Sequence, residues 1–390
     1  MSPVAAALAP FGTTIFTTMS RLALEHGAVN LSQGFPDFEG PAFVKEAAIA
    51  AIRSQSNQYA PMPGVPVLRQ AIARRFTRDT GLPADPDTHV TVTAGCTEAI
   101  AATILGICNP GDEVVLFEPF YDSYRACVAM AGCVPRFVAL RPDAQGRFVF
   151  DPDELAATFC PRTRAVIINT PHNPTGKVFS REELASIAAL CVKHNCIAVA
   201  DEVYERLIFD TARTPHVSIA TLSGMADRTV VLSSLGKTFS LTGWKIGWAV
   251  AAPPLSAAVR AAHQFLTFAV NTPMQHAAAV ALEREQEYVP TLVALLAANR
   301  QALCAALREL GYGVHEPYGT YFILANHSKF GFASDLAFCT HLIEKVGIAA
   351  IPPSVFYEHA ELGTSLVRFA FCKRPDTIVA AIARLRAGGR

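Results

Sequence analysis

The sequence predicts an α/β fold whose large domain holds a mostly parallel sheet covered by helices, with a small α+β domain beside it. Short apolar runs typical of buried strands recur along the middle of the chain, and one helix is expected between successive strands. Polar residues follow directly where these strands end, as expected at the ligand-binding edge of a parallel sheet. The 390 residues, 51% of them hydrophobic, suffice for two or three domains with large cores.

Composition argues against several classes of protein. Lys plus Arg and Asp plus Glu each number 33, so there is no global basic field for nucleic acid. No run of about eighteen apolar residues suggests a membrane span, and residues 1–10 lack the basic region of a signal peptide. Ten cysteines fall singly in apolar segments without a Cys-x-x-Cys pair, which favours a reducing cytoplasm.

The N-terminal part contains two loops rich in turn residues. Residues 30–38 combine Gly34, Pro36 and Asp37 with two phenylalanines, which favours a loop packed over another part of the molecule, although an ordinary buried turn fits equally. Helices are expected over residues 41–53 and 67–80. Prolines and a glycine stiffen the loop between them, so it could present Tyr59 at a distance, whereas a core position is the alternative.

The next two predicted strands each lead into a candidate ligand site. A strand over residues 89–94 precedes Gly95-Cys96-Thr97, which opens a helix, and a glycine at a helix N-terminus can bind phosphate through backbone N–H groups. A strand over residues 113–117 is followed by aromatic residues, of which Tyr121 could stack on a flat ligand. Core packing would also explain these aromatic residues.

Two further strands end in polar side chains. The strand over residues 164–169 runs into Thr-Pro-His-Asn-Pro-Thr-Gly, and after a helix over residues 181–194 the next strand ends near Asp201 and Tyr204. These side chains fall just past the carboxyl ends of parallel strands, where ligands bind. Asp201 could instead cap the following helix.

Residues 233–248 form the most informative stretch, a loop between apolar runs at residues 230–232 and 248–250. No Asp or Glu occurs between Asp227 and Glu283, so the cations of that interval lack a local partner; they are Arg228, Lys237, Lys245 and Arg260. A lysine near buried surface and beside a second cation has a pKa below about 10.4 and offers a nucleophilic amine. An exposed loop with solvated lysines is the alternative.

The C-terminal part predicts the small domain. A long charged helix over about residues 283–310 is followed by strands near 318–324, 348–351 and 366–371 that alternate with helices. Arg368 is the one charge in the last strand, and a buried guanidinium must meet an anion or form an internal salt bridge. We expect an N-terminal arm, residues 1–40, to join the small domain formed by residues 285–390, with residues 41–284 as the large cofactor-binding domain.

From about residue 12 to 386, these motifs resemble in content and order the class I/II aminotransferases, the fold type I pyridoxal 5'-phosphate (PLP) enzymes. The similarity is greatest to the branch of methionine, kynurenine and glutamine aminotransferases. The resemblance implies a homodimer that binds PLP, an amino acid and a 2-oxo acid, with no metal, nucleic acid or membrane as partner.

The resemblance also implies roles for single residues. Lys237 matches the Schiff-base lysine and general acid/base, Asp201 the partner of the pyridine nitrogen, and Tyr204 and Asn173 the groups that bond the ring oxygen O3′. Tyr121 matches the ring that stacks on the cofactor. The remaining matches concern the cofactor phosphate: Gly95, Cys96, Thr97, Ser234, Lys245 and, from the partner chain, Tyr59. Most of the class has arginine where this chain has Lys245, but the branch named above uses lysine.

The same resemblance places Arg368 on the substrate α-carboxylate, which Asn173 also contacts, and Gly34 where that carboxylate approaches the backbone. Phe16 and Phe35 are candidate walls of the side-chain pocket. No arginine lies between Arg260 and Arg284, and residues 265–272 are nearly apolar, so a second substrate carboxylate would lack a partner.

We therefore expect an aminotransferase that moves the α-amino group of a neutral thioether or aromatic amino acid, such as methionine, to a 2-oxo acid. Cysteine-S-conjugate β-lyase or kynurenine aminotransferase activity as the main role is the alternative among enzymes. Outside enzymes, such a domain can form the effector-binding half of a transcription regulator, which would require a DNA-binding domain.

Overall fold

The computed structural model describes residues 4–54 and 56–388 and is built around a seven-stranded sheet. The strand order is β2-β10-β9-β8-β7-β3-β4, and all strands run parallel except β10, which is antiparallel to both neighbours. The predicted α/β class is therefore confirmed. The strands are β2 (Val90–Thr93), β3 (Glu113–Glu118), β4 (Val134–Ala139), β7 (Thr163–Asn169), β8 (Ile197–Asp201), β9 (Thr229–Ser234) and β10 (Gly247–Ala251).

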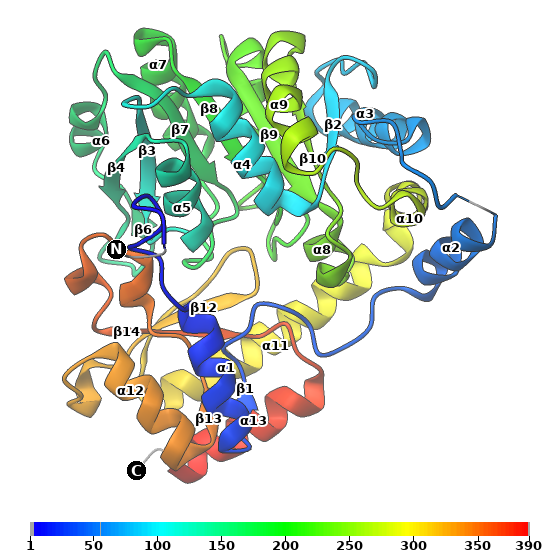
Figure 1. Cartoon of the computed structure of the whole chain (residues 1–390). Coiled ribbons are helices and arrows are strands. Elements are labelled where there is room, and N and C mark those ends of the chain that lie inside the picture. Colours follow the sequence, from blue (N-terminus) through cyan, green and yellow to red (C-terminus); the bar gives the residue numbers. More distant parts are fainter. Residues whose placement is uncertain (1–3, 55, 389–390) are drawn as a thin grey trace.

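Helices cover both faces of this sheet (Figure 1). Side chains alternate along each strand, so in β3 Val114 and Leu116 join the core on one face and Val115 and Phe117 the core on the other. Burial on both faces explains why these strands are almost continuously apolar in sequence. One face carries α4 (Gly95–Ile107), α5 (Asp122–Met130) and α9 (Pro253–Leu266); the other packs on α6 (Pro152–Thr158), α7 (Arg181–His194), α2 (Ala42–Arg53), α3 (Pro66–Thr80) and α10 (Thr272–Glu283).

Local sequence signals set several helix ends. Helix α7 begins after Ser180, which forms a capping box with Glu183, and ends at Asn195 in the left-handed conformation. Lys193 and His194 in its last turn complement the helix dipole. These signals lie next to each other in the chain, so the predicted range 181–194 agrees with the structure.

The small α+β domain gathers elements from both ends of the chain. Strand β1 (Val29–Asn30) pairs in parallel with β13 (Ile348–Ala349), and α1 packs beside the C-terminal elements (Figure 1). A three-stranded antiparallel sheet lies next to them. The further elements are α1 (Ile15–Glu25), α11 (Val289–Glu309), β11 (Gly313–His315), β12 (Phe322–Asn326), α12 (Asp335–His341), β14 (Leu366–Ala370) and α13 (Pro375–Gly388), and β5 (Arg141–Pro142) and β6 (Phe148–Val149) form a hairpin on the large domain.

Two expected helices differ from the structure. The helix expected from residue 283 is interrupted, because α10 ends at Glu283 and α11 starts only at Val289, with a proline in its first turn. Helix α11 is long and apolar enough to cross a membrane by length and composition, but Leu292, Leu303 and other leucines pack in the small-domain core.

No α-helix separates β8 from β9, contrary to the expected alternation. Residues 202–228 contain only two short 3-10 turns, at Ile219–Thr221 and Ala226–Arg228. The chain instead reaches the small domain, where Ile208 forms a β-bridge with Gly319 and the Phe209 amide donates to the Tyr318 carbonyl. This connection holds the two domains together next to Tyr204.

Candidate functional site

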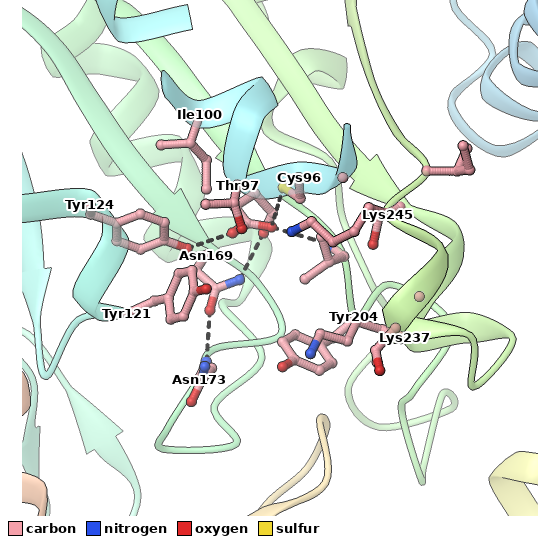
Figure 2. A pocket seen from close by; sticks show the side chains of 17 residues that line it. Cys96, Thr97, Ile100, Tyr121, Tyr124, Asn169, Asn173, Tyr204, Lys237 and Lys245 are labelled. Atoms are coloured by element: carbon pink, nitrogen blue, oxygen red, sulfur yellow. Dashed lines mark hydrogen bonds between the residues drawn. The ribbon is translucent and has the colours of Figure 1, made fainter. Parts of the chain in front are cut away.

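A cavity of about 230 Å³ opens at the carboxyl ends of β7, β8 and β9, next to the N-terminus of α4 (Figure 2). All the residues predicted to hold a cofactor line it, except Tyr59. They are joined by residues that were not predicted, of which Tyr124, Asn169 and Thr242 are polar. The predicted lining residues are Gly95, Cys96, Thr97, Tyr121, Asn173, Asp201, Tyr204, Ser234, Lys237 and Lys245.

One end of the cavity suits an anion. Gly95 begins α4 with a φ of +77°, and a Cβ atom there would lie 3.1 Å from the Lys245 Nζ atom, so the ammonium sits directly over the helix N-terminus. Gly247 packs against the back of this turn, where a Cβ atom would come within 2.5 Å of the Gly95 carbonyl carbon. The free N–H groups of α4, the Ser234 hydroxyl and the Lys245 charge fit a phosphate group.

Lys237 lies on the short helix α8 (Leu235–Thr238), which follows β9. Its Nζ atom donates a hydrogen bond to the Gly34 carbonyl at 3.3 Å and lies 5.7 Å from the ring centroids of Tyr204 and Tyr321. Burial lowers the pKa of Lys237, and the Arg368 charge lowers it further, while Cys372 and Asp201 act in the opposite direction. The environment therefore favours the neutral amine, which is the nucleophilic form.

The Asp201 carboxylate ends β8 and accepts three hydrogen bonds. The Tyr124 hydroxyl donates at 2.6 Å, the Val203 amide at 3.3 Å and the Cys96 thiol at 3.6 Å. Burial raises the pKa of Asp201, and the hydrogen bonds from Tyr124 and Val203 oppose that rise. A protonated ring nitrogen facing this carboxylate would compensate its burial, so the site fits a pyridinium ring.

Two asparagines connect the ends of β7 and β8. The Asn169 side chain donates to the Asp201 carbonyl at 2.9 Å and accepts from the Asn173 amide at 2.7 Å (Figure 2). This arrangement fixes the loop that carries Asn173. Two sequence features could have indicated these residues. Asn169 is a polar residue at the end of an apolar strand, and Tyr124 lies on α5 three residues after Tyr121, so the two rings face the same side.

Arg368 is 1% exposed and has no carboxylate partner among the described residues, so the internal salt bridge considered above is not formed. Its guanidinium donates to the Asn173 side-chain oxygen at 3.2 Å and to the Ser32 carbonyl at 3.0 Å, while Nε has no partner. Burial lowers the pKa of Arg368 to about 10. An anion is therefore the missing partner of this charge.

Aromatic rings surround the Arg368 guanidinium. The ring centroids of Phe322, Phe16 and Phe356 lie 4.3, 5.2 and 5.2 Å from its central carbon. These rings make the surroundings of the charge apolar, which strengthens its attraction to a carboxylate.

Gly34 approaches both the lysine and the small domain. Its carbonyl accepts hydrogen bonds from Lys237 and from the Tyr321 hydroxyl, the latter at 2.7 Å. A Cβ atom at Gly34 would lie 2.7 Å from the Phe322 ring, so only glycine fits without a shift of that ring. Tyr321 was not predicted, because nothing in its local sequence indicates that its hydroxyl reaches residue 34.

Five predicted site residues do not line this cavity, namely Gly34, Arg368, Phe16, Phe35 and Tyr59, and the last two of them are exposed. Phe35 is half-exposed, and its ring packs 5.2 Å from the Lys373 ammonium. Tyr59 is 84% exposed and packs edge-on against Phe268, so it does not reach the cavity of its own chain.

The four cations that lack an acidic residue nearby in the sequence make different contacts in the structure. Arg260 donates to the carbonyls of Asp87 and Val90, and Arg228 donates to the Gly224 carbonyl and the Asn195 side chain. Only the two lysines, Lys237 and Lys245, line the cavity.

The chain matches one family model, "Aminotransferase class I and II", over residues 27–385. It is 50% identical over 386 residues to the probable N-succinyldiaminopimelate aminotransferase DapC of Mycobacterium tuberculosis, covering 97% of this chain and 96% of the relative. It is 42% identical over 383 residues to the methionine aminotransferase of Escherichia coli, covering 97% of each. Human kynurenine–oxoglutarate transaminase 1 is 37% identical over 396 residues, covering 94% of this chain and 93% of the relative.

Solved structures of other aminotransferases have the same fold. The Mycobacterium tuberculosis N-succinyldiaminopimelate aminotransferase superimposes with a TM-score of 0.95 at 50% identity, covering 98% of this chain and 99% of the other. The Escherichia coli protein with a methionine aminotransferase function gives 0.93 at 42% identity, with the same coverage. An aspartate aminotransferase of Thermus thermophilus with maleate gives 0.91 at 30% identity, covering 99% and 100%.

Proposed function

The chain belongs to the class I and II aminotransferases, which depend on PLP, and on that premise we propose that its amino donor is a neutral amino acid with a thioether or aromatic side chain. The observation that carries the proposal is the setting of Arg368. The Arg368 guanidinium lacks an anionic partner, which one substrate carboxylate would supply, and three phenylalanine rings surround it. Among the described residues that line the neighbouring cavity, the cations are the two lysines assigned to the cofactor, so no further cation there offers a partner to a second substrate carboxylate.

The assigned residues divide the work between cofactor and substrate. The turn at Gly95 and the side chains of Ser234 and Lys245 would hold the cofactor phosphate, while Tyr121, Asn173 and Tyr204 would contact its ring. When bound, PLP supplies an aldehyde that reacts with amines and a ring that withdraws electrons from the substrate Cα atom. Asp201 would keep a proton on the ring nitrogen.

Lys237 would serve as the proton carrier. Burial favours its neutral amine, which can take the proton from the substrate Cα atom as a general base. The resulting ammonium can then donate that proton as a general acid. Arg368 would hold the substrate carboxylate through two N–H groups, which fixes the Cα–H bond relative to Lys237. Tyr321 and Gly34 close the side of the site next to the lysine.

Donor selectivity tests the proposal. We expect kcat/KM for methionine or phenylalanine to exceed that for aspartate by at least about a hundredfold, because burying a second carboxylate without a partner costs several kcal/mol. The measurement uses one 2-oxo acid acceptor throughout. Aspartate equal to methionine would refute the apolar pocket and leave the family assignment intact.

A second candidate donor is N-succinyldiaminopimelate, favoured by the 50% identity to a relative with that name. Its acyl group carries a carboxylate far from the reacting carbon. If kcat/KM for this donor exceeds that for methionine tenfold, the second candidate replaces the first. Kynurenine and a cysteine S-conjugate belong in the same series, with pyruvate release from the conjugate reporting β-elimination.

We also propose that the functional protein is a homodimer. An apolar patch, defined by Tyr59, Phe265, Leu266 and Phe268, is exposed on the single chain, and Phe265 is 85% exposed. In the resembling family a tyrosine at the Tyr59 position reaches the partner's cofactor phosphate. The proposed location is the cytoplasm, supported by ten cysteines that are all unpaired.

Charge placed on the patch tests the pairing of chains. We expect Phe265→Glu to shift the protein from dimer to monomer in sedimentation velocity, whereas Leu24→Glu, on α1 and also 85% exposed, leaves the dimer intact. Tyr59→Phe should keep the dimer and weaken PLP binding by about five- to tenfold, since one hydrogen bond to a phosphate is lost. A wild-type protein that sediments as an active monomer would refute the proposal.

A further inference from the structure

His263 lies fully buried on α9, and both of its ring nitrogens face hydrogen-bond acceptors. Nε2 is 3.0 Å from the Met62 carbonyl oxygen and Nδ1 is 2.6 Å from a carboxylate oxygen of Glu98. A carbonyl oxygen only accepts, so Nε2 carries a proton. The contact between Nδ1 and the Glu98 carboxyl group is therefore the second hydrogen bond of the ring.

Glu98 connects this histidine to the phosphate turn. Its second oxygen accepts a hydrogen bond from the amide of Ala94, the residue just before Gly95, where α4 begins. Ala94 is the N-cap residue of α4, and the Glu98 carboxylate reaches back to its amide from the first turn of the helix, as the glutamate of a capping box does. The position of the turn therefore depends on the position of Glu98.

On its other side, His263 holds the loop that carries Tyr59. Met62 belongs to that loop, and the neighbouring Pro63 carbonyl accepts from the Val92 amide of β2. The His263 carbonyl accepts from the Phe268 amide, and Phe268 has a φ of +66° and packs its ring on Tyr59. His263 thus contacts the Tyr59 loop and Phe268 of the apolar patch directly, and the phosphate turn through Glu98.

We infer that His263 and Glu98 are positioning residues that hold the phosphate turn and the Tyr59 loop of one chain in a fixed arrangement, so that the turn faces the cofactor phosphate of its own chain while Tyr59 faces that of the partner. The inference rests on the proposed roles of Gly95 and Tyr59. Neither side chain lines the cavity, so the pair acts through the backbone at Ala94 and Met62.

Three substitutions separate positioning from charge. In Glu98→Gln the amide oxygen can accept from Ala94 and the amide nitrogen can donate to Nδ1 of a neutral ring, so every hydrogen bond is kept without the charges. Glu98→Ala leaves the Ala94 amide and the His263 Nδ1 atom without partners, while Nε2 keeps the Met62 carbonyl. His263→Leu fills the volume but leaves the Glu98 carboxylate buried without its partner.

The readout is the affinity of the full-length protein, stripped of cofactor, for PLP and for pyridoxal, which lacks the phosphate. We expect Glu98→Ala and His263→Leu to weaken PLP binding about tenfold and to change pyridoxal binding less than about twofold. Glu98→Gln should stay within about threefold of wild type for both. Ser256→Ala is the matched control, because Ser256 is also buried on α9 and polar but bonds carbonyls away from the turn.

Hydrogen exchange of residues 57–65 gives a second measurement that does not depend on cofactor. Exchange there should quicken in His263→Leu and not in Ser256→Ala. An unchanged ratio of PLP to pyridoxal affinity in both disruptive variants, with unchanged exchange, overturns the inference. A wild-type protein that does not prefer PLP to pyridoxal would instead refute the proposed phosphate site.

Discussion

Lys237→Ala should lose the visible absorbance of bound cofactor and lower the transamination rate by on the order of 10⁴-fold, the upper range for a general acid/base. Lys237 lines the cavity, burial favours its amine form, and its Nζ atom lies 5.7 Å from the ring centroids of both Tyr204 and Tyr321. No other described lysine shares this position. The measurements are the absorbance spectrum of the purified protein and single-turnover rates with methionine.

Reduction with borohydride locates the reactive amine directly. In wild type the reduced cofactor should appear on the peptide that contains Lys237, and Lys237→Ala should carry none. Lys245→Ala serves as the control, because Lys245 lines the same cavity but lies over the phosphate turn. It should still be labelled on Lys237 and bind PLP more weakly. A label on any other lysine would contradict the assignment.

Arg368→Leu should lower kcat/KM for methionine by about 10²- to 10³-fold, since a buried carboxylate would lose its charged partner. Arg368→Lys should lose nearly as much, because an ammonium cannot bind both carboxylate oxygens through a planar fork. The cofactor spectrum should change little, since Arg368 does not line the cavity.

A substrate analogue without the carboxylate distinguishes direct carboxylate binding by Arg368 from a general attraction by positive charge in this region. Wild type should strongly prefer methionine to 3-(methylthio)propylamine, which lacks the carboxylate, and Arg368→Leu should lose most of that preference. Lys373→Met is the control: Lys373 is another buried cation that donates to the carbonyls of Gln33 and Phe35 nearby. If Lys373→Met reduces the preference equally, Arg368 does not bind the carboxylate itself.

The fold was predictable wherever neighbouring residues carry the signal. The ends of α7 follow from Ser180, Glu183 and Asn195, and the strands of the sheet from apolar runs buried on both faces. Two helix predictions were wrong, one because a tertiary contact decides the segment and one because a local start signal was overlooked. The segment after β8 pairs with Gly319 of the small domain, and Pro290 starts a new helix after the charged turn.

The site was predictable where strand ends and family motifs coincide, as at Asp201 and Lys237. Tyr124, Asn169 and Tyr321 escaped, since their hydroxyl and amide groups act on residues 32 to 287 positions away in the chain. The exposure of Phe35 was also beyond a sequence argument, because it depends on which surfaces the single chain leaves uncovered, whereas the exposure of Tyr59 agrees with the expectation that its loop presents it at a distance.

The pairing of β1 with β13 can form only after nearly the whole chain has been synthesised. Val29 pairs with Ile348, roughly 320 residues later in the chain, and at 5 to 20 residues per second the ribosome needs on the order of 15 to 60 seconds to supply that partner. During this interval the N-terminal helix, with Met19 and Ala23 on its apolar face, has no core to pack against. Strand β8, which ends at Asp201, and the strands that precede Gly95 and Lys237 are synthesised well before then. A nascent chain can therefore complete its cofactor-binding sheet while its first helix still lacks the core that it covers in the finished protein.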